Sequence, residues 1–182
     1  MIMEKEQKNI LENINFTIRA YEKNDARVIV PWLSDKTTFC RWSQGKYSEF
    51  PVKEKDMIEY YEAFEGDNKT FPITACDNGK IVGHMLLKLI DEEKKVVRFG
   101  CIIVDASKRG KGYGTKMLNS AIEYAFKTLN ANEITIGVFE DNVPARKCYE
   151  KLGFSNTGEF NYITMLGDTY KCLEYVRQRD NL

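Results

Sequence analysis

The sequence predicts an α+β protein with one central, mostly antiparallel sheet of about seven strands and helices packed on both of its faces. Several short segments alternate between apolar and polar residues, which is the period of a half-buried strand. From 113 to 129 the apolar residues instead recur at helical spacing. A further strand follows that helix, and a strand, a helix and a strand in this order form a right-handed unit with parallel strands. The sheet should therefore contain one parallel pair.

The composition is that of an ordinary globular protein without a global charge. The chain has 182 residues, 43% of them hydrophobic, and its 27 basic side chains balance 27 acidic ones. The length favours one domain over 1–182, with a polar extension at 1–13. Zero net charge argues against nucleic acid or an anionic membrane as a partner. Five cysteines without a C-x-x-C pair argue against a disulfide framework or a metal site. Without a signal-like start or an apolar run of ~20 residues, we expect a cytoplasmic protein.

The first half of the chain is predicted to start with a strand and then to become helical. Residues alternate between apolar and polar over 16–21, and the segment 25–64 is mainly helical, with its last helix ending before Gly66. Two strands then flank Asp77-Asn78-Gly79, because Asn-Gly supplies the positive φ angles of a tight hairpin turn. A third strand at 96–104 completes an antiparallel meander.

The second half alternates helices and strands. A strand at 133–140 should lie parallel to the strand 96–104, since the long helix connects the two. A short helix starts with Pro144 in its first turn and ends at Gly153. Two weaker strands close the chain, at 155–164 and 169–177.

The segment "KRGKGYG" at 108–114 places three glycines between a strand and the long helix. Glycines let successive backbone N–H groups turn toward one point, and here they stand at the positive end of a helix dipole. Such groups can hold a diphosphate, and Lys108, Arg109 and Lys111 add positive charge at the rim. A P-loop or a G-x-G-x-x-G fingerprint is excluded, because each would need a glycine at Thr115. The alternative is a plain strand-to-helix turn, for which one glycine should suffice.

At these residues the chain resembles the GCN5-related N-acetyltransferases (GNAT). The acetyl-coenzyme A signature of that family, Gln/Arg-x-x-Gly-x-Gly/Ala, is matched here by Arg109-Gly110-Lys111-Gly112-Tyr113-Gly114. An apolar strand ends five residues earlier, at Val104. The second block of the family appears as "NVPARKCYEKLGF", with Asn142, Ala145, Tyr149, Gly153 and Phe154 at the expected positions. The resemblance covers about residues 16–177, and the opening segment is similar to the ribosomal-protein-alanine N-acetyltransferase branch.

The resemblance implies a fold and a binding mode for acetyl-coenzyme A (acetyl-CoA). In the family the fourth and fifth strands, a parallel pair, splay apart, and the pantetheine arm lies between them. The sequence alone does not show the splay, although Gly100 is compatible with a local bulge. The N–H of Val104 would polarise the thioester carbonyl. The residues implied to bind the cofactor are Ile102, Ile103, Val104, Arg109, Gly110, Lys111, Gly112, Tyr113, Gly114, Thr115, Asn142, Ala145 and Tyr149.

The resemblance also makes Tyr149 catalytic, as the acid that protonates the departing thiolate. A phenol with a pKa near 10 is a weaker acid than a thiol near 8.5, so this transfer is unfavourable by ~2 kcal/mol in water. It helps only where the site desolvates the thiolate. The alternative is an aromatic ring packed on Ala145 and Leu152 at helical spacing.

Several neighbouring residues leave their roles open. Asn142 could bind pantetheine, cap the helix 143–151, or do both. Cys148 could carry an acetyl group, but nothing in the sequence supplies the base that such a nucleophile needs. Direct attack by the amine in a ternary complex is therefore favoured.

The general base is not identified by the sequence. His84 is better explained as a buried sheet residue than as a base. Many family members carry a glutamate on the fourth strand, and here the strand 96–104 has none. Asp105 and Glu140 are the nearest acidic residues along the chain.

Together these features predict an acetyl-CoA-dependent N-acetyltransferase that needs no metal and acts on a primary amine, either a small molecule or a peptide N-terminus. A non-catalytic acyl-CoA sensor and a nucleotide-binding protein are the alternatives. The acceptor pocket should lie between 25–66 and the C-terminal strands, with Trp32, Trp42 and Tyr47 as wall or core residues. Homodimers that pair through strands occur in the family, although no residue here indicates one.

Overall fold

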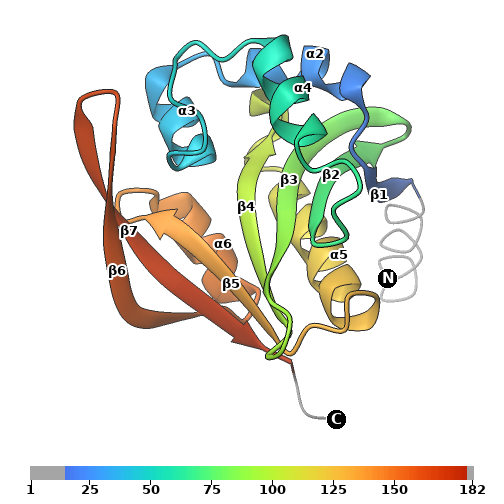
Figure 1. Ribbon diagram of the computed structural model, residues 1–182, viewed down its shortest axis with the longest axis vertical. Coiled ribbons are helices and arrows are strands. Elements are labelled where there is room, and N and C mark those ends of the chain that lie inside the picture. Colours follow the sequence, from blue (N-terminus) through green and yellow to red (C-terminus); the bar gives the residue numbers. More distant parts are fainter. Residues whose placement is uncertain (1–14, 180–182) are drawn as a thin grey trace, which may run out of the picture.

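A seven-stranded sheet with the strand order β1-β2-β3-β4-β5-β7-β6 forms the centre of the protein (Figure 1). The computed structural model describes residues 15–179, so the polar extension predicted at 1–13 lies outside the described residues. Only β4 and β5 run parallel, and all other neighbouring strands are antiparallel. This confirms the predicted fold. The strands are β1 (Phe16–Ala20), β2 (Thr70–Asp77), β3 (Lys80–Asp91), β4 (Val96–Val104), β5 (Glu133–Phe139), β6 (Ser155–Met165) and β7 (Asp168–Gln178).

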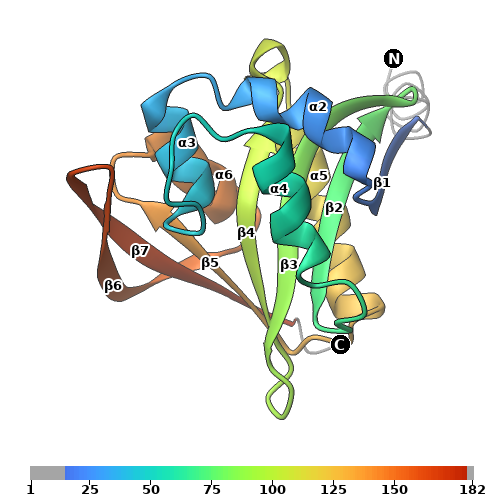
Figure 2. The same ribbon diagram turned by 45° about the horizontal axis from the view of Figure 1, so that its top comes forward.

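Helices cover both faces of the sheet (Figure 2). One face carries α5 (Tyr113–Lys127) and α6 (Val143–Lys151). The other face carries α2 (Ala26–Ile29), α3 (Lys36–Ser43) and α4 (Glu54–Glu62). The segment predicted to be mainly helical is thus a series of short helices. Three 3-10 turns join the elements: η1 (Lys23–Asp25), η2 (Val30–Trp32) and η3 (Ala106–Lys108).

Each face of the sheet has its own hydrophobic core. On the α5 side, the apolar stripe of the helix packs on inward-facing strand residues such as Val97 and Ile134. On the α3 side, Phe39, Trp42 and Met57 pack against residues of β4 and β5 such as Phe139. The two cores fix the sheet between two helical layers, which positions the ends of β4 and β5 between α3 and α6.

The turns follow the predicted chemistry. Asn78 and Gly79 have φ angles of 50° and 75°, and they join β2 to β3 as a two-residue hairpin. The helix α6 begins with Pro144 in its first turn, and Gly153 follows its end with a φ of 81°. Pro144 thus marks the start of this helix and Gly153 its end, as predicted.

Candidate functional site

The strands β4 and β5 form a fork. They pair over only four residues, ending with Phe99 opposite Ile136, and then separate toward the top of Figure 1. The unpaired segments, 100–104 of β4 and 137–139 of β5, are called the fork below. Gly100 and Gly137 stand directly after the last pair. The splay that the family resemblance implied is therefore present.

A bulge in β4 shapes one arm of the fork. His84 of β3 lies opposite Ile103, whereas Leu86 lies opposite Gly100, so two residues of β4 face Met85 alone. One of them, Cys101, has a φ of 49°, which is unusual for a residue with a side chain. The sequence suggested Gly100 as the site of a bulge; the structure places the bulge one residue later.

The pairing of β4 with β3 directs the backbone N–H of Val104 into the fork. The N–H of Asp105 donates to the C=O of Val82 at 3.0 Å, so those two residues form a hydrogen-bonded pair of the β3–β4 ladder. Antiparallel strands alternate such pairs with pairs that point outward. Val104, the next residue, therefore turns its N–H away from β3 and toward the fork. Its C=O accepts a bond from Arg109 Nε at 3.2 Å.

The glycine loop closes the top of the fork at the first turn of α5. Gly110 and Gly112 have φ angles of 72° and 83°, and Gly112 is the N-cap of the helix. The turn itself thus requires two glycines, which corrects the expectation that one would suffice. A Cβ built on either residue meets nothing within 4 Å. The exposed Arg109 stands beside this space, while Lys111 Nζ donates to the C=O of Ser107. The loop is open to an anionic ligand.

A cavity of about 380 Å³ occupies the fork. Most of the residues that the sequence analysis assigned to the cofactor line it: Ile102, Ile103, Val104, Arg109, Gly110, Gly114, Asn142, Ala145 and Tyr149. Four do not: Lys111, Gly112, Tyr113 and Thr115.

Gly112 has no side chain, and the side chains of the other three are engaged elsewhere, that of Lys111 with the C=O of Ser107. The hydroxyl of Tyr113 donates to Asp77 Oδ2 at 2.6 Å, on the side of the β2–β3 turn. The hydroxyl of Thr115 lies 3.5 Å from Cys148 Sγ. A ligand in the fork would thus meet these residues through backbone groups, which a residue-type motif does not distinguish from side-chain contacts.

Tyr149 lies at the wall of this cavity. Its ring is buried against Phe154 and Tyr175, with centroid separations of 6.1 and 6.5 Å. Burial raises the pKa of its hydroxyl well above the usual value, with smaller contributions from Cys148 and Cys172. The hydroxyl is therefore protonated at neutral pH. The ring thus packs in the core, on Phe154 and Tyr175, while the residue also lines the cavity; its catalytic role stays a prediction.

Asn142 is the N-cap of α6 by position, but its side chain makes no capping hydrogen bond. The backbone performs that role, since the N–H of Arg146 bonds to the C=O of Asn142 at 3.1 Å. The side-chain amide instead belongs to the cavity lining. This favours the ligand-facing reading over the side-chain cap.

The helix α3 supplies lining residues that sequence reasoning missed. Thr38, Arg41 and Gln44, the C-cap residue of α3, join the expected Trp42 in covering the fork on the face opposite α5. Gln44 Nε2 donates to the C=O of Gly137 at 3.0 Å, at the point where the strands separate. No signal in the sequence links α3 to a site about 60 residues further along. Of the three aromatic residues expected as walls, Trp42 lines the cavity, while Tyr47 stacks on it at 4.7 Å.

None of the three candidate bases fits that role. His84 is fully buried, bonds to the hydroxyl of Tyr61 at 2.6 Å, and has a pKa lowered by burial to about 3. The carboxylate of Asp105 accepts the N–H of Ser107, and Glu140 pairs with Lys171 at 2.8 Å. None of the three lines the cavity.

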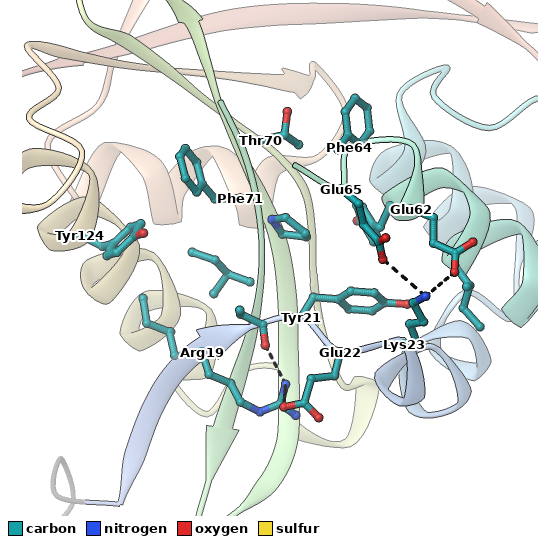
Figure 3. A pocket seen from close by; sticks show the side chains of 16 residues that line it. Arg19, Tyr21, Glu22, Lys23, Glu62, Phe64, Glu65, Thr70, Phe71 and Tyr124 are labelled. Atoms are coloured by element: carbon teal, nitrogen blue, oxygen red, sulfur yellow. Dashed lines mark hydrogen bonds and ion pairs between the residues drawn. The ribbon is translucent and has the colours of Figure 1, made fainter. Parts of the chain in front are cut away.

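A second, larger cavity of about 580 Å³ lies elsewhere, between β1, the start of β2 and α4 (Figure 3). It shares no lining residue with the cavity in the fork. Lys23 bridges Glu62 at 2.6 Å and Glu65 at 3.4 Å across its rim. Arg19 is held by Asp25 at 2.7 Å. The charges that surround this cavity are thus largely paired with one another.

Residues 15–179 contain neither a membrane-spanning helix nor a cluster of metal-ligating side chains. None of the helices there is long and apolar enough to cross a membrane. Within the same residues no group of three or more His, Cys, Asp or Glu side chains is placed to hold a metal ion.

Comparison with known proteins gives consistent results. The acetyltransferase (GNAT) family model matches residues 36–154. The spermidine N(1)-acetyltransferase of Vibrio cholerae is 29% identical over 147 residues, which cover 80% of this chain and 82% of that protein. An L-amino acid N-acetyltransferase of Escherichia coli is 33% identical over 88 residues, 47% of this chain and 54% of that protein.

Solved structures share the fold. The crystal structure of spermidine N-acetyltransferase from Vibrio cholerae in complex with CoA and spermine matches with a TM-score of 0.77 at 24% identity, over 90% of this chain and 95% of that one. The family model covers more than half of the chain, and acetyl-CoA is the acyl donor of the family. The similarity to the ribosomal-protein-alanine branch stays a prediction. The protein is therefore an N-acetyltransferase and belongs to the acetyltransferase (GNAT) family.

Proposed function

We propose that the fork binds acetyl-CoA and that the chain transfers the acetyl group to a primary amine by direct attack in a ternary complex. One observation carries this proposal: outward-facing backbone N–H groups of β4, the open glycine loop and Tyr149 all border one cavity. Acetyl-CoA needs these three features: hydrogen-bond donors along its pantetheine arm, a binding place for its diphosphate, and an acid near its sulfur.

The diphosphate would lie at the glycine loop. The N–H groups at the start of α5 point toward the open space beside Gly110 and Gly112, where the helix dipole favours negative charge. Arg109 adds a full positive charge and can donate a charge-assisted hydrogen bond. The pantetheine arm would then follow β4, next to the small side chain of Ala145 and the amide of Asn142.

The chemical step uses Val104 and Tyr149. The amine nitrogen attacks the thioester carbon, and the N–H of Val104 stabilises the negative charge that develops on the carbonyl oxygen. The C–S bond then breaks, and Tyr149 donates its proton to the sulfur, so that CoA leaves as a thiol. The nitrogen, which became positively charged when the C–N bond formed, loses one proton to water, and the phenolate takes a proton back from water, so that the products are the N-acetylated amine and the CoA thiol. Because burial weakens Tyr149 as an acid, the same burial must also raise the proton affinity of the thiolate for the transfer to be favourable.

Direct attack is preferred to an acetyl-cysteine intermediate. Cys148 lines the cavity, and its sulfur contacts the hydroxyl of Thr115. A hydroxyl at 3.5 Å is not a base that could generate a thiolate. Cys148 is therefore assigned a packing role at the cofactor wall.

The acceptor must reach the thioester as a neutral amine. None of the residues lining the cavity, within the described part of the chain, is an aspartate, a glutamate or a histidine. The amine would then lose its proton to water before attack. At pH 7 a lysine-type amine is neutral in about one molecule in 2,500, against about one in ten for an α-amine. This favours an acceptor whose amine has a low pKa.

The named relatives act on amines of several kinds, including spermidine, an L-amino acid and an aminoglycoside. They support a primary amine as the acceptor and do not select among these classes. The proposal is tested by measuring CoA release from acetyl-CoA with a panel of amino acids, polyamines, aminoglycosides and peptide N-termini. We expect release with at least one class. Tight binding of acetyl-CoA without release with any of them would instead favour the sensor function.

A further inference from the structure

The apex of the fork faces an unusual arrangement of charges on the α3 side. A methyl group at Gly137 would lie 2.8 Å from Arg98 Nη2 and 3.0 Å from Cys172 Sγ. At Gly100 the nearest atoms to such a group would be Nζ and Cε of Lys46, at 3.6 and 3.7 Å. Two cationic side chains therefore approach the two glycines that mark the start of the cavity.

The chain reversal after α3 brings Lys46 to this position. Gln44 and Gly45 both have positive φ angles, 46° and 84°, and the N–H of Lys46 bonds back to the C=O of Ser43. The turn rests on β6, because a Cβ at Gly45 would lie 3.5 Å from Ile163. Lys46 is thus held over the apex by the backbone turn, while its ammonium group stays accessible to solvent.

Lys46 has no counter-ion among residues 15–179. None of the carboxylates in that part of the chain forms an ion pair with its ammonium group within 4 Å, and no hydrogen bond of its side chain is present there. Burial raises the pKa of the Cys172 thiol, and the nearby charges of Arg98 and Lys46 oppose that rise.

Two carboxylates near the fork are engaged with other cations, and a third, Asp105, accepts the N–H of Ser107. Glu174 accepts two hydrogen bonds from Arg98, at 2.8 and 2.9 Å. Asp141 pairs with Arg41 at 3.1 Å. With Arg109 assigned to the diphosphate, Lys46 is a cation without an ion pair in residues 15–179 that lies beside the cavity, against its lining residue Gly100.

From this juxtaposition we propose that the acceptor is an amine that also carries a carboxylate, which Lys46 binds at the apex of the fork while the amine points toward the thioester. A polyamine would meet an uncompensated cation and would find no free carboxylate in the described lining. A single ammonium group matches one negative charge, which fits a carboxylate better than a phosphate dianion. This inference rests on the proposed acetyl transfer and specifies its substrate class.

The test compares matched acceptors that differ only in the carboxylate. CoA release is measured with L-amino acids, β-alanine and γ-aminobutyrate, each alongside its own carboxamide, and with spermidine. Rates are compared at equal concentrations of the neutral amine. We expect kcat/KM to be about tenfold higher for the carboxylate than for its amide, which corresponds to ~1.4 kcal/mol.

Variants of Lys46 assign the effect to this side chain. Lys46→Gln should raise KM for the carboxylate acceptor about tenfold and leave both the amide and the affinity for acetyl-CoA unchanged. Lys46→Glu should reverse the preference toward spermidine. Lys55→Gln is the matched control, because Lys55 is an exposed lysine on α4 that pairs only with Glu59; its kinetics should equal those of the wild type.

The outcomes separate the two proposals. Acetylation of spermidine with inert amino acids, or an equal loss of carboxylate and amide acceptors in Lys46→Gln, would overturn the carboxylate site while the acetyltransferase function stands. Equal rates with acid and amide in the wild type would do the same. Absence of CoA release with every amine would overturn the proposed transfer itself.

Discussion

The larger cavity between β1, the start of β2 and α4 is called the cavity behind β1 below. It differs from the cavity in the fork in whether its polar groups already have partners within the protein. The cavity behind β1 is the larger, about 580 against 380 Å³. Yet its charged rim is closed by its own ion pairs, with Lys23 between two glutamates and Arg19 on Asp25. The cavity in the fork is smaller but retains the outward-facing N–H of Val104 and an open glycine loop, and beside its lining residue Gly100 stands Lys46, which has no ion pair within residues 15–179. Unsatisfied donors, more than volume, distinguish the site where an anionic ligand can bind.

Each cavity contains a buried tyrosine, and the hydroxyl groups of the two tyrosines have different partners. Tyr61 of the cavity behind β1 and Tyr149 of the fork are both almost completely buried tyrosines. The hydroxyl of Tyr61 forms a 2.6 Å hydrogen bond with Nε2 of the buried His84. Tyr149 has no such bond to another described side chain and faces the fork cavity. The first tyrosine should thus act on stability and the second on turnover.

The largest effect is expected from Tyr149→Phe. Removing the proton donor should lower kcat about 10²-fold, at the lower end of general-acid effects, which is ~2.7 kcal/mol of barrier. The affinity for acetyl-CoA and the melting temperature should stay close to those of the wild type. Steady-state kinetics of CoA release check this.

The control for this substitution is Tyr61→Phe. It should leave kcat within about twofold and instead destabilise the fold by about 1–3 kcal/mol, because it leaves a buried nitrogen of His84 without its partner. An unchanged kcat in Tyr149→Phe would remove that residue from the mechanism.

The next effect concerns His84 and the pH dependence of stability. Burial lowers its pKa from 6.5 to about 3, so the unfolded chain takes up a proton below pH 6.5 while the folded chain does not. Stability should therefore fall as the pH drops, by ~2 kcal/mol between pH 7 and pH 5 for this group. Urea unfolding at the two pH values measures the loss.

His84→Gln should remove that part of the pH dependence. The pH profile of kcat/KM should be the same in the variant and the wild type, because His84 does not line the fork cavity. A profile that loses an inflection near neutral pH in His84→Gln would instead show that the buried histidine acts in catalysis.

A smaller effect is expected from Arg109→Ala. The substitution removes the one full charge at the glycine loop that lines the fork cavity, and it should weaken acetyl-CoA binding about tenfold, or ~1.4 kcal/mol. The loss should shrink at high salt, because an exposed charge is screened. Isothermal titration at two ionic strengths checks this, and an affinity equal to that of the wild type would place the diphosphate elsewhere.

The smallest effect is expected from Lys23→Ala at the rim of the cavity behind β1. Lys23 is exposed and its ion pairs with Glu62 and Glu65 lie at the surface, where such pairs contribute little. The melting temperature, the affinity for acetyl-CoA and kcat should all be indistinguishable from the wild type. A measurable change in kcat would mean that this cavity communicates with the fork, and the contrast between the two cavities would then be less sharp.

The course of the backbone could be predicted largely from the sequence. The alternation over β1 to β4, the Asn-Gly turn and the helical stripe of α5 each follow from local chemistry, so the sheet and its one parallel pair were predicted correctly. The same holds for the glycine loop, where Gly110 and Gly112 adopt left-handed backbone conformations, which glycine adopts without strain. The expectation that one glycine would suffice for a plain strand-to-helix turn was wrong, since the turn alone needs both Gly110 and Gly112.

The side-chain composition of the site could be predicted only in part. Nine predicted residues lie at the cavity, six of them from the two motif segments and three from β4, because each of these segments is short and continuous in the chain. Tyr113 fits the motif by position, yet its hydroxyl turns to Asp77, on the hairpin between β2 and β3. Arg41, Gln44 and Lys46 carry no motif, and they reach the fork only because α3 packs across it.

The sequence by itself thus determined the order of the elements, the open backbone of the glycine loop and the two segments that meet at the fork, because these depend on residue type and short-range spacing. Only the tertiary structure decided that β4 and β5 separate after four pairs, that His84 is a buried neutral partner of Tyr61, and that Lys46 lies over the apex without an ion pair in residues 15–179. Those features depend on contacts between residues far apart in the chain, which desolvate one group and leave another exposed, and no local pattern encodes them.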